Sequence, residues 1–491
     1  MPMSLRRVLP AFAMMMLCAC SIQPKRISDL KSAYLHSQGR LAECASLYAK
    51  ADELTIKTSA IDAQFARLTG FPHLRSNRFL ASLSGELKEK HKLKAWMEAM
   101  AKRDQQARQI ELQNANALDF ASIEALDKCA ELMMQEDLQD PEQIEKIREA
   151  AVVADSYLKG NRIFGIYPIS SLFVKRGVGK LQKKIKQTFS IAEKDLAVKG
   201  TLLRYAPEKP LEISEDEIAK LLRTSSSNVL SLPSFNVYDE NRLFRHFAPV
   251  WEVDEVSDDD KIGSPYWSAD EQLKINTSDG VVYQYLSYMK VKGQILPQFN
   301  YIIWFPARTA TSVADILSGR LDGITWRVTV GRDGKVLMYD AMHNCGCYHM
   351  FFPAGSTVMR ELPLSDREEP LLVPKRGPVR EVGQRVHLRI AAGSHYIESV
   401  LAKDLSIEHR VYRFADYNQL RSIAMKNGKY KSMFGATGIV PGSSRKERWL
   451  LWPMGVEDAG AMRQWGHHAT AFIGRRHFDD ADLLERYFSF P

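Results

Sequence analysis

The chain of 491 residues carries a formal net charge of +8 and contains 45% hydrophobic and 26% charged residues. This composition is that of a globular protein, and the length predicts two or three domains. The positive charge is modest for this length, which argues against nucleic acid as a partner. The sequence contains no Walker phosphate loop, dinucleotide glycine motif, HExxH, GxSxG or CxxCH motif, which excludes the simplest enzyme assignments.

The first residues have the order of an export signal. Arg6 and Arg7 precede a short apolar run over residues 8–17, whereas a membrane-spanning helix needs ~20 residues. The segment Leu17-Cys18-Ala19-Cys20 then resembles the lipobox of bacterial lipoproteins. The resemblance implies a signal peptide at residues 1–19, a diacylglycerol on the sulfur of Cys20, and an acyl chain such as palmitate on its new amino group. An ordinary signal peptide with a chance cysteine is the alternative.

The resemblance also predicts a location and a partner. Ser21 follows the lipidated cysteine, and a serine there resembles an outer-membrane address. We therefore expect a protein anchored to the outer membrane through its lipid, with its body facing the periplasm or the cell surface. A protein of the envelope or the cell wall is the expected further partner. The resemblance covers about two dozen residues, and the remainder resembles no characterised family.

Residues 20–224 are predicted to form an all-helical domain. Asp140 and Pro141 indicate a helix start, and apolar residues at helical spacing follow as far as Leu158. Ser214-x-x-Glu217 is typical of a capping box. The apolar run at 163–174 is expected to lie in the core or in a surface loop. The lysines and arginines at 175–186 are expected on a solvated helix face, with contact to anionic lipid as the alternative.

A polar break at 224–228 separates this part from a predicted β-rich domain at 229–491. Residues 281–291 and 299–305 are predicted to pair as strands. Ile324 to Val330 alternates apolar and polar residues, and a Gly-Arg-Asp-Gly turn leads to a return strand at 335–339. Residues 385–391 alternate again, and 480–488 indicate a short helix. The predicted fold class is α+β, with an all-helical N-terminal domain and a mainly antiparallel β C-terminal domain.

The segment HNCGCYH, residues 343–349, contains the candidate site residues His343, Cys345, Cys347 and His349. In a straight strand these four would share one face and extend over about 20 Å. A tetrahedral zinc site needs its ligands within ~2.0–2.3 Å of the metal. We therefore expect a bend at Gly346 that brings at least one cysteine and one histidine to a common pocket.

Three roles for this segment remain open. In the first hypothesis the segment is a zinc or copper site, completed by His467, His468 or His477. In the second, export to an oxidising compartment leads to disulfides, with Cys44 pairing to Cys129 and Cys345 to Cys347. In the third, a thiolate attacks a substrate, with His343 or His349 as base and Asp340 orienting it.

Two functions follow from these alternatives. The first is a lipid-anchored binding or scaffold module of the envelope, whose β domain presents a surface to a partner. The second is a metal-dependent or thiol enzyme centred on residues 343–349. The sequence identifies no substrate and leaves open whether the protein is an enzyme.

Overall fold

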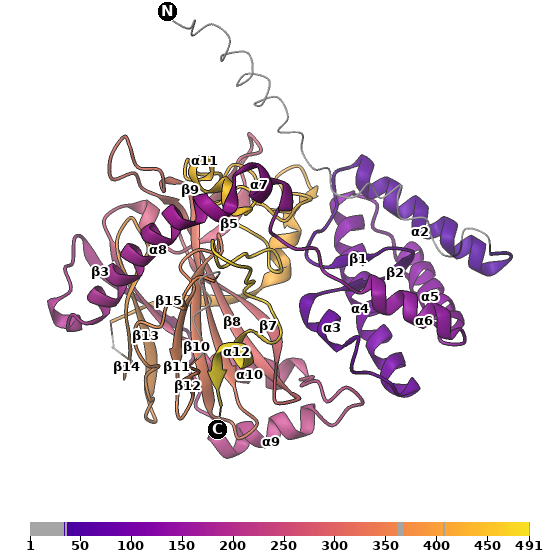
Figure 1. Cartoon of the computed structure of the whole chain (residues 1–491), viewed down its shortest axis with the longest axis horizontal. Helices are drawn as coiled ribbons and strands as arrows, with labels where there is room; N and C mark the ends of the chain where they lie inside the picture. Colours follow the sequence, from indigo (N-terminus) through magenta and orange to yellow (C-terminus); the bar gives the residue numbers. More distant parts are fainter. Residues whose placement is uncertain (1–33, 35–36, 362–367, 406–407, 491) are drawn as a thin grey trace, which may run out of the picture.

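The computed structural model describes residue 34 and residues 37–361, 368–405 and 408–490. It confirms the α+β class, because a helical region at residues 40–190 is followed by a large curled sheet that is mostly antiparallel. In Figure 1 the first helices, coloured indigo, lie to the right of the sheet. The predicted signal peptide at 1–19 and the predicted lipidation site Cys20 lie outside the described residues.

The helical region is interrupted by one small hairpin, so it is not all-helical as predicted. The hairpin pairs β1 (Ala66–Leu68) with β2 (Phe71–Ser76) and turns at Gly70, whose φ of 90° glycine adopts without strain. The helices are α2 (Arg40–Lys57), α3 (Arg78–Leu83), α4 (Lys90–Asn114), α5 (Phe120–Asp137), α6 (Pro141–Ala150), α7 (Lys159–Phe164) and α8 (Tyr167–Phe189).

A disulfide between Cys44 and Cys129 joins α2 to α5, which confirms the predicted pairing. The two Cα atoms are 5.3 Å apart, although the cysteines are separated by 85 residues in the sequence. A link across so long a loop stabilises the fold mainly by restricting the unfolded chain.

Two predicted helix starts are present, each with a side-chain hydrogen bond at its N-cap. The Asp140 side chain accepts a hydrogen bond from the Glu142 amide at 2.9 Å, and Pro141 occupies the first turn of α6. The hydroxyl of Ser214 accepts one from the Glu217 amide at 3.2 Å, at the start of α9 (Glu215–Ser225). Helix α6 ends at Ala150, eight residues before the predicted end of its apolar stripe at Leu158.

The central sheet has ten strands in the order β11-β10-β9-β8-β7-β15-β3-β4-β13-β14. Strand β15 is parallel to both of its neighbours, β13 is parallel to β4, and the other neighbours are antiparallel. The strands are β3 (Thr201–Pro207), β4 (Val250–Glu255), β7 (Gly280–Val291), β8 (Gln294–Arg308), β9 (Gly319–Val330), β10 (Val336–His343), β11 (Met350–Pro353), β13 (Gln384–Ile390), β14 (Ile397–Asp404) and β15 (Arg410–Asp416). The predicted strand pairs at 281–305 and 324–339 are thus confirmed.

Smaller elements cover the sheet and its ends. The helices and turns are α10 (Val237–Phe247), α11 (Arg448–Leu451), α12 (Leu483–Tyr487), η3 (Glu193–Asp195), η4 (Asp258–Asp260), η5 (Tyr417–Arg421) and η6 (Trp452–Met454). The short strands are β5 (Ser264–Trp267), β6 (Leu273–Asn276), β12 (Val358–Met359), β16 (Ile423–Ala424), β17 (Tyr430–Lys431) and β18 (Phe488–Ser489). The helix predicted at 480–488 is therefore present as α12.

The change from helix to sheet occurs earlier than the predicted break at 224–228. Strand β3 begins at Thr201 and pairs inside the central sheet with β4 and β15. Helix α9 then packs its buried Ile218 and Leu222 into the core of that sheet. The polar residues at the break end α9, where the side chain of Asn228 donates a hydrogen bond to the Ser225 carbonyl at 3.0 Å.

Alternating side chains of β8 divide between two cores. Phe299, Tyr301 and Ile303 pack with residues of α9, α10 and the second half of α8. Ile302 and Trp304 face the opposite side, where β5, β6 and the C-terminal loops cover them. Strands β8 and β9 are therefore buried on both faces over most of their length. Within the described part of the chain, no helix is both long and apolar enough to cross a membrane.

Candidate functional site

The curl of the sheet brings together strand ends that are distant in the strand order. The ends of β8 and β9 meet the turn between β13 and β14. The ring of Phe305 stacks on that of His395 with centroids 4.0 Å apart. The guanidinium of Arg308 donates through Nη2 to the Tyr396 hydroxyl at 3.1 Å. The candidate site lies at this junction.

Asp322, on β9, is the centre of the buried polar cluster at the junction. Its carboxylate is 3.2 Å from Nη2 of Arg445, 3.0 Å from Nδ1 of His395 and 3.5 Å from Nδ1 of His343. Nε2 of His395 in turn lies 3.4 Å from the carboxylate of Asp260. All five side chains are buried, so these charges interact with little screening.

The pKa values of the two histidines in the cluster are shifted in opposite directions. Burial lowers the pKa of His343, and the attraction of Asp322 only partly opposes this effect. Burial also disfavours charge on His395, but hydrogen bonds with Asp260 and Asp322 outweigh it and raise the pKa of this imidazole. The two carboxylates therefore favour the protonated form of His395, whereas burial favours the neutral form of His343.

Three residues of this junction have left-handed backbone conformations. The φ angles are 60° at Leu321, 56° at Tyr348 and 53° at His395. Such angles are unfavourable for residues with a side chain, and they gather where surrounding contacts enforce them, often at functional sites.

The HNCGCYH segment is bent at Gly346, as predicted. Strand β10 ends at His343, and a tight turn follows in which the Gly346 amide donates to the His343 carbonyl at 2.7 Å. Gly346 has a φ of 89°, and a Cβ there would lie 2.4 Å from the Ala469 carbonyl oxygen. Only glycine fits this position, because both the dihedral and the space exclude a side chain.

The bend does not gather the four predicted ligands. His343 faces Asp322, whereas Nε2 of His349 lies 2.8 Å from Asp340, which also pairs with Arg327. Of the two histidines that Asp340 was predicted to orient, it contacts His349. Among the described residues no three histidine, cysteine or acidic side chains are placed together to hold a metal ion. Nε2 of His467 instead contacts the Ala63 carbonyl oxygen at 2.7 Å.

Cys345 and Cys347 are free thiols in the structure, which differs from the predicted disulfide. Burial alone would raise the pKa of Cys345, but a hydrogen bond from Cys347 and the charge of Arg445 together lower it. The pKa of Cys347 is raised well above its ordinary value. The same hydrogen bond is the largest cause, and burial is the next. Cys345 is therefore the thiol that ionises first, and Cys347 is the donor that stabilises it.

A cleft of about 430 Å³ opens beside this cluster. Helix α8 forms one wall, and the β13–β14 turn and the loop after β8 form the others. Arg308 and Tyr396 line it, and the Tyr396 hydroxyl donates to that of Tyr348 at 3.0 Å. The cleft is thereby connected to the HNCGCYH segment through two tyrosines. Further lining residues include Lys184, Lys199, Asp315 and Glu398.

Arg308 gives this cleft an unused hydrogen-bond donor. Its side chain is buried, with 6% of the residue exposed, and Nη2 is engaged by Tyr396. Nη1 is buried and has no hydrogen-bond partner among the described residues. A buried guanidinium donor without a partner is unfavourable, and an anionic ligand atom would satisfy it.

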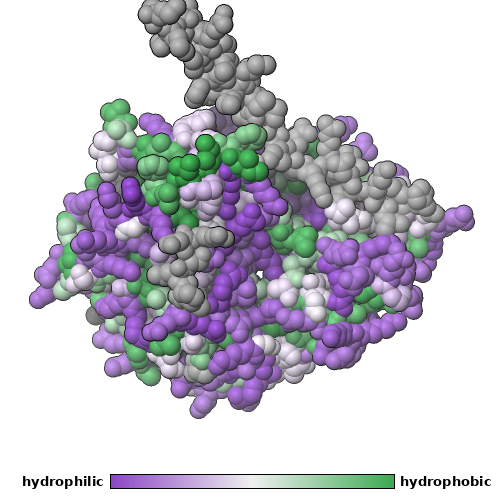
Figure 2. Space-filling model, viewed as in Figure 1, coloured by the Kyte–Doolittle hydropathy of each residue, from purple (hydrophilic) through white to green (hydrophobic). Residues whose placement is uncertain are grey.

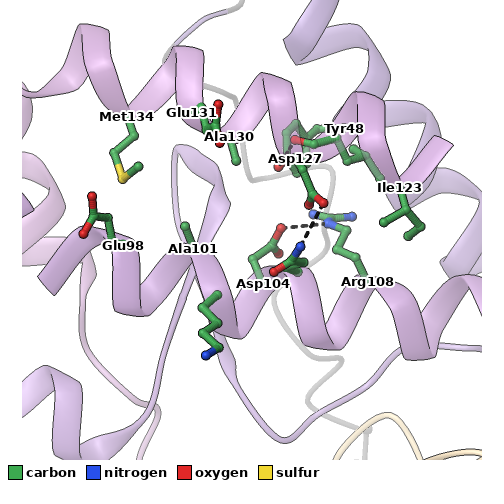
Figure 3. A pocket seen from close by; sticks show the side chains of 13 residues that line it. Tyr48, Glu98, Ala101, Asp104, Arg108, Ile123, Asp127, Ala130, Glu131 and Met134 are labelled. Atoms are coloured by element: carbon green, nitrogen blue, oxygen red, sulfur yellow. Dashed lines mark hydrogen bonds and ion pairs between the residues drawn. The ribbon is translucent and has the colours of Figure 1, made fainter. Parts of the chain in front are cut away.

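A second pocket, of about 230 Å³, lies between α2, α4 and α5 (Figure 3). Its charged groups satisfy one another: Arg108 pairs with Asp104 at 3.2 Å, and the Gln105 amide donates to Asp127 at 2.8 Å. No buried polar side-chain atom among its lining residues lacks a partner. This pocket therefore lacks the unpaired buried donor that makes ligand binding favourable in the Arg308 cleft.

The sequence patterns did not identify Arg308, Asp322, His395 or Arg445. These residues belong to four separate segments, and only the curl of the sheet brings them together. One signal was present in the sequence. Asp322 lies two residues before Ile324, on the same alternating face as Ile324 and Trp326, which places a carboxylate on a buried face. Comparison with protein-family models, curated proteins and solved structures finds no match for this chain.

Proposed function

We propose that this protein is a lipid-anchored binding module of the bacterial envelope, and that its cleft holds a carboxylate-bearing ligand such as a peptide. The observation that carries the proposal is the buried Nη1 of Arg308, which lacks a partner in a cleft of suitable size. Arginine binds carboxylates strongly because its charged, planar group donates in a fixed geometry.

The remaining lining groups favour a ligand that also has a positive or hydrogen-bond-donating part. Lys184 and Lys199 add positive charge to the cleft, but Glu398 lies there too, and burial raises the pKa of its carboxyl group. The Asp315 carboxylate already accepts hydrogen bonds from the amides of Thr311 and Leu317. A peptide, with a carboxylate and an amino group, matches this mixture better than a simple anion.

The envelope assignment is supported by the lipobox resemblance at Cys20 and by the Cys44–Cys129 disulfide. Disulfides persist in exported proteins, since the cytoplasm keeps most thiols reduced. A protein held at the outer membrane would meet peptides of the cell wall and segments of other envelope proteins, which are the partners expected above.

Calorimetric titration with the dipeptide alanyl-alanine tests the cleft. We expect saturable binding to the unaltered chain, and binding about ten- to a hundredfold weaker in Arg308→Gln, since a hydrogen bond to a charged group contributes about 1.5–3 kcal/mol. Alanyl-alanine amide, which lacks the carboxylate, is the control ligand. Arg332→Gln, at an exposed turn, is the control variant. Equal binding of the dipeptide and its amide would contradict the proposal.

Thiol chemistry is the second candidate function, because Cys345 has a lowered pKa and an adjacent donor thiol. A lowered pKa provides the thiolate that attacks disulfides or electrophiles. The pair would then alternate between two thiols and the disulfide that the sequence predicted. In that case an electron acceptor or donor of the envelope, itself a protein dithiol or disulfide, would be the partner.

Mass spectrometry of the purified, unreduced chain distinguishes the two states. After denaturation with an alkylating agent, we expect label on Cys345 and Cys347 and none on Cys44 or Cys129. The reason is that the structure holds the first pair as thiols and the second as a disulfide. An unlabelled, linked Cys345–Cys347 pair would show that the oxidised form is the resting state and would favour the redox function.

A further inference from the structure

An apolar surface lies on α7 and the first half of α8, where the sequence predicted core or a surface loop. Six large hydrophobic residues there are between 58% and 82% exposed. Three of them, Ile169, Leu172 and Phe173, follow helical spacing along α8, so these three project from one side of that helix. The six residues are Ile163, Phe164, Ile166, Ile169, Leu172 and Phe173. Exposed clusters of this kind mark sites of interaction with proteins or membranes.

Helix α11 and the η6 turn that follows it extend this surface. A Cβ on Gly165, between α7 and α8, would lie 2.4 Å from Cβ of Pro453 in η6, so the two segments are in close contact. Trp449 and Leu450 of α11 are 68% and 63% exposed beside them. In Figure 2 hydrophobic residues gather in the area where Figure 1 places α7 and the adjoining part of α8. We call these eight residues together the α7–α8 surface.

The segment that carries α7 and α8 is strongly basic. Residues 159–189 contain eight lysines and arginines and no aspartate or glutamate. They are Lys159, Arg162, Lys175, Arg176, Lys180, Lys183, Lys184 and Lys186. The second half of α8 is fixed to the protein, since Ile185 and Phe189 lie in the core of the sheet. The exposed apolar half of α8 is therefore held in place at the edge of a strongly basic helix.

We propose that the α7–α8 surface docks on an anionic lipid bilayer. Apolar side chains would enter the boundary between headgroups and acyl chains, tryptophan is favoured at that depth, and lysine and arginine would contact anionic headgroups. A second copy of the chain is a poorer occupant, because pairing this surface with itself would bring two basic helices together. The docking goes beyond the ligand binding proposed above and does not depend on lipidation of Cys20.

Photocrosslinking in vesicles tests the contact directly. The photoreactive residue p-benzoylphenylalanine replaces Phe173 in one sample of the full chain and Val382 in another. Val382 is 92% exposed and precedes β13, at the end of that strand away from the cleft. Vesicles contain phosphatidylethanolamine and phosphatidylglycerol. A lipid anchor would bring both positions to the vesicle equally, so their ratio reports the docking surface itself.

We expect adducts with lipid at position 173 to exceed those at position 382 by on the order of tenfold, and to decrease in neutral phosphatidylcholine vesicles. The double variant Ile169→Asp, Leu172→Asp should reduce the adducts at 173 to the level at 382, whereas Val382→Asp should not. Both altered residues are exposed, so circular dichroism should show an unchanged fold.

Two outcomes would overturn the docking proposal. Equal lipid adducts at positions 173 and 382 would show that the surface has no preference for the bilayer. Adducts at 173 mainly with a second copy of the chain would identify self-association instead. Neither outcome affects the cleft, because alanyl-alanine binding is measured without vesicles.

Discussion

Asp322→Ala should lower the free energy of unfolding by about 3–5 kcal/mol, the range for removing one partner of a buried ion pair. Asp322 is fully buried and faces Arg445 and His395, both of which would remain buried without their counter-charge. The raised pKa of His395, which hydrogen bonds with Asp260 and Asp322 sustain against burial, should decrease in the same variant. Urea unfolding of both chains at pH 7 measures the change.

Two further variants show whether the charge of Asp322 is the cause. Asp322→Asn keeps the size of the side chain and removes its charge, so it should also be strongly destabilised. Asp270→Ala removes an acidic side chain that is 65% exposed and should leave the urea midpoint nearly unchanged. An Asp322→Asn chain as stable as the unaltered protein would mean that His395 and Arg445 do not depend on this carboxylate.

Acidification from pH 6.5 to 4.5 should destabilise the protein steeply. Burial, the main cause in each case, lowers the pKa of His349 to about 4 and those of His246 and His468 to about 3. In the unfolded chain these histidines bind protons below the ordinary histidine pKa of ~6.5, whereas in the folded protein they stay neutral there. The stability that these three histidines contribute is therefore fully present above pH ~6.5. It is lost as the pH falls towards their pKa values in the folded protein.

The three histidines together should lower the free energy of unfolding by about 4 kcal/mol per pH unit near pH 5.5, at about 1.4 kcal/mol each. Buried Glu369 and Glu447 act in the opposite sense, since burial raises the pKa of each carboxyl group. His468→Gln isolates one contribution: its pH profile should be shallower than that of the unaltered chain by about 1.4 kcal/mol per pH unit. Parallel profiles would show that His468 is protonated in the folded protein.

Local sequence patterns predicted the α+β class and five of the ten strands of the central sheet. The alternation in Ile324 to Val330, with a glycine turn after it, is sufficient to define the β9–β10 hairpin, because both signals are local. The Cys44–Cys129 disulfide belongs to one of the three pairings open to four cysteines, and the expectation of an oxidising compartment predicted that disulfides would form. The bend at Gly346 was predicted because a straight strand would hold residues 343 and 349 too far apart to share one site.

The site was less predictable because it depends on long-range geometry. Arg308 and Tyr396 are 88 residues apart, and no local pattern indicates that the sheet curls far enough to join them. The apolar run at 163–174 had helical spacing, but spacing alone does not reveal whether a second element covers that face. The structure places it in α7 and α8 with six large side chains exposed.

The proposed ligand cleft is tested most directly by a crystal structure of the protein soaked with alanyl-alanine. We expect the dipeptide in the cleft between α8 and the β13–β14 turn, with a carboxylate oxygen about 2.7–2.9 Å from Nη1 of Arg308. Tyr396 should keep its hydrogen bond with Nη2, because that donor is already engaged in the free protein. Density for the dipeptide elsewhere, or an Nη1 that donates to an oxygen of the protein itself, would contradict the proposal.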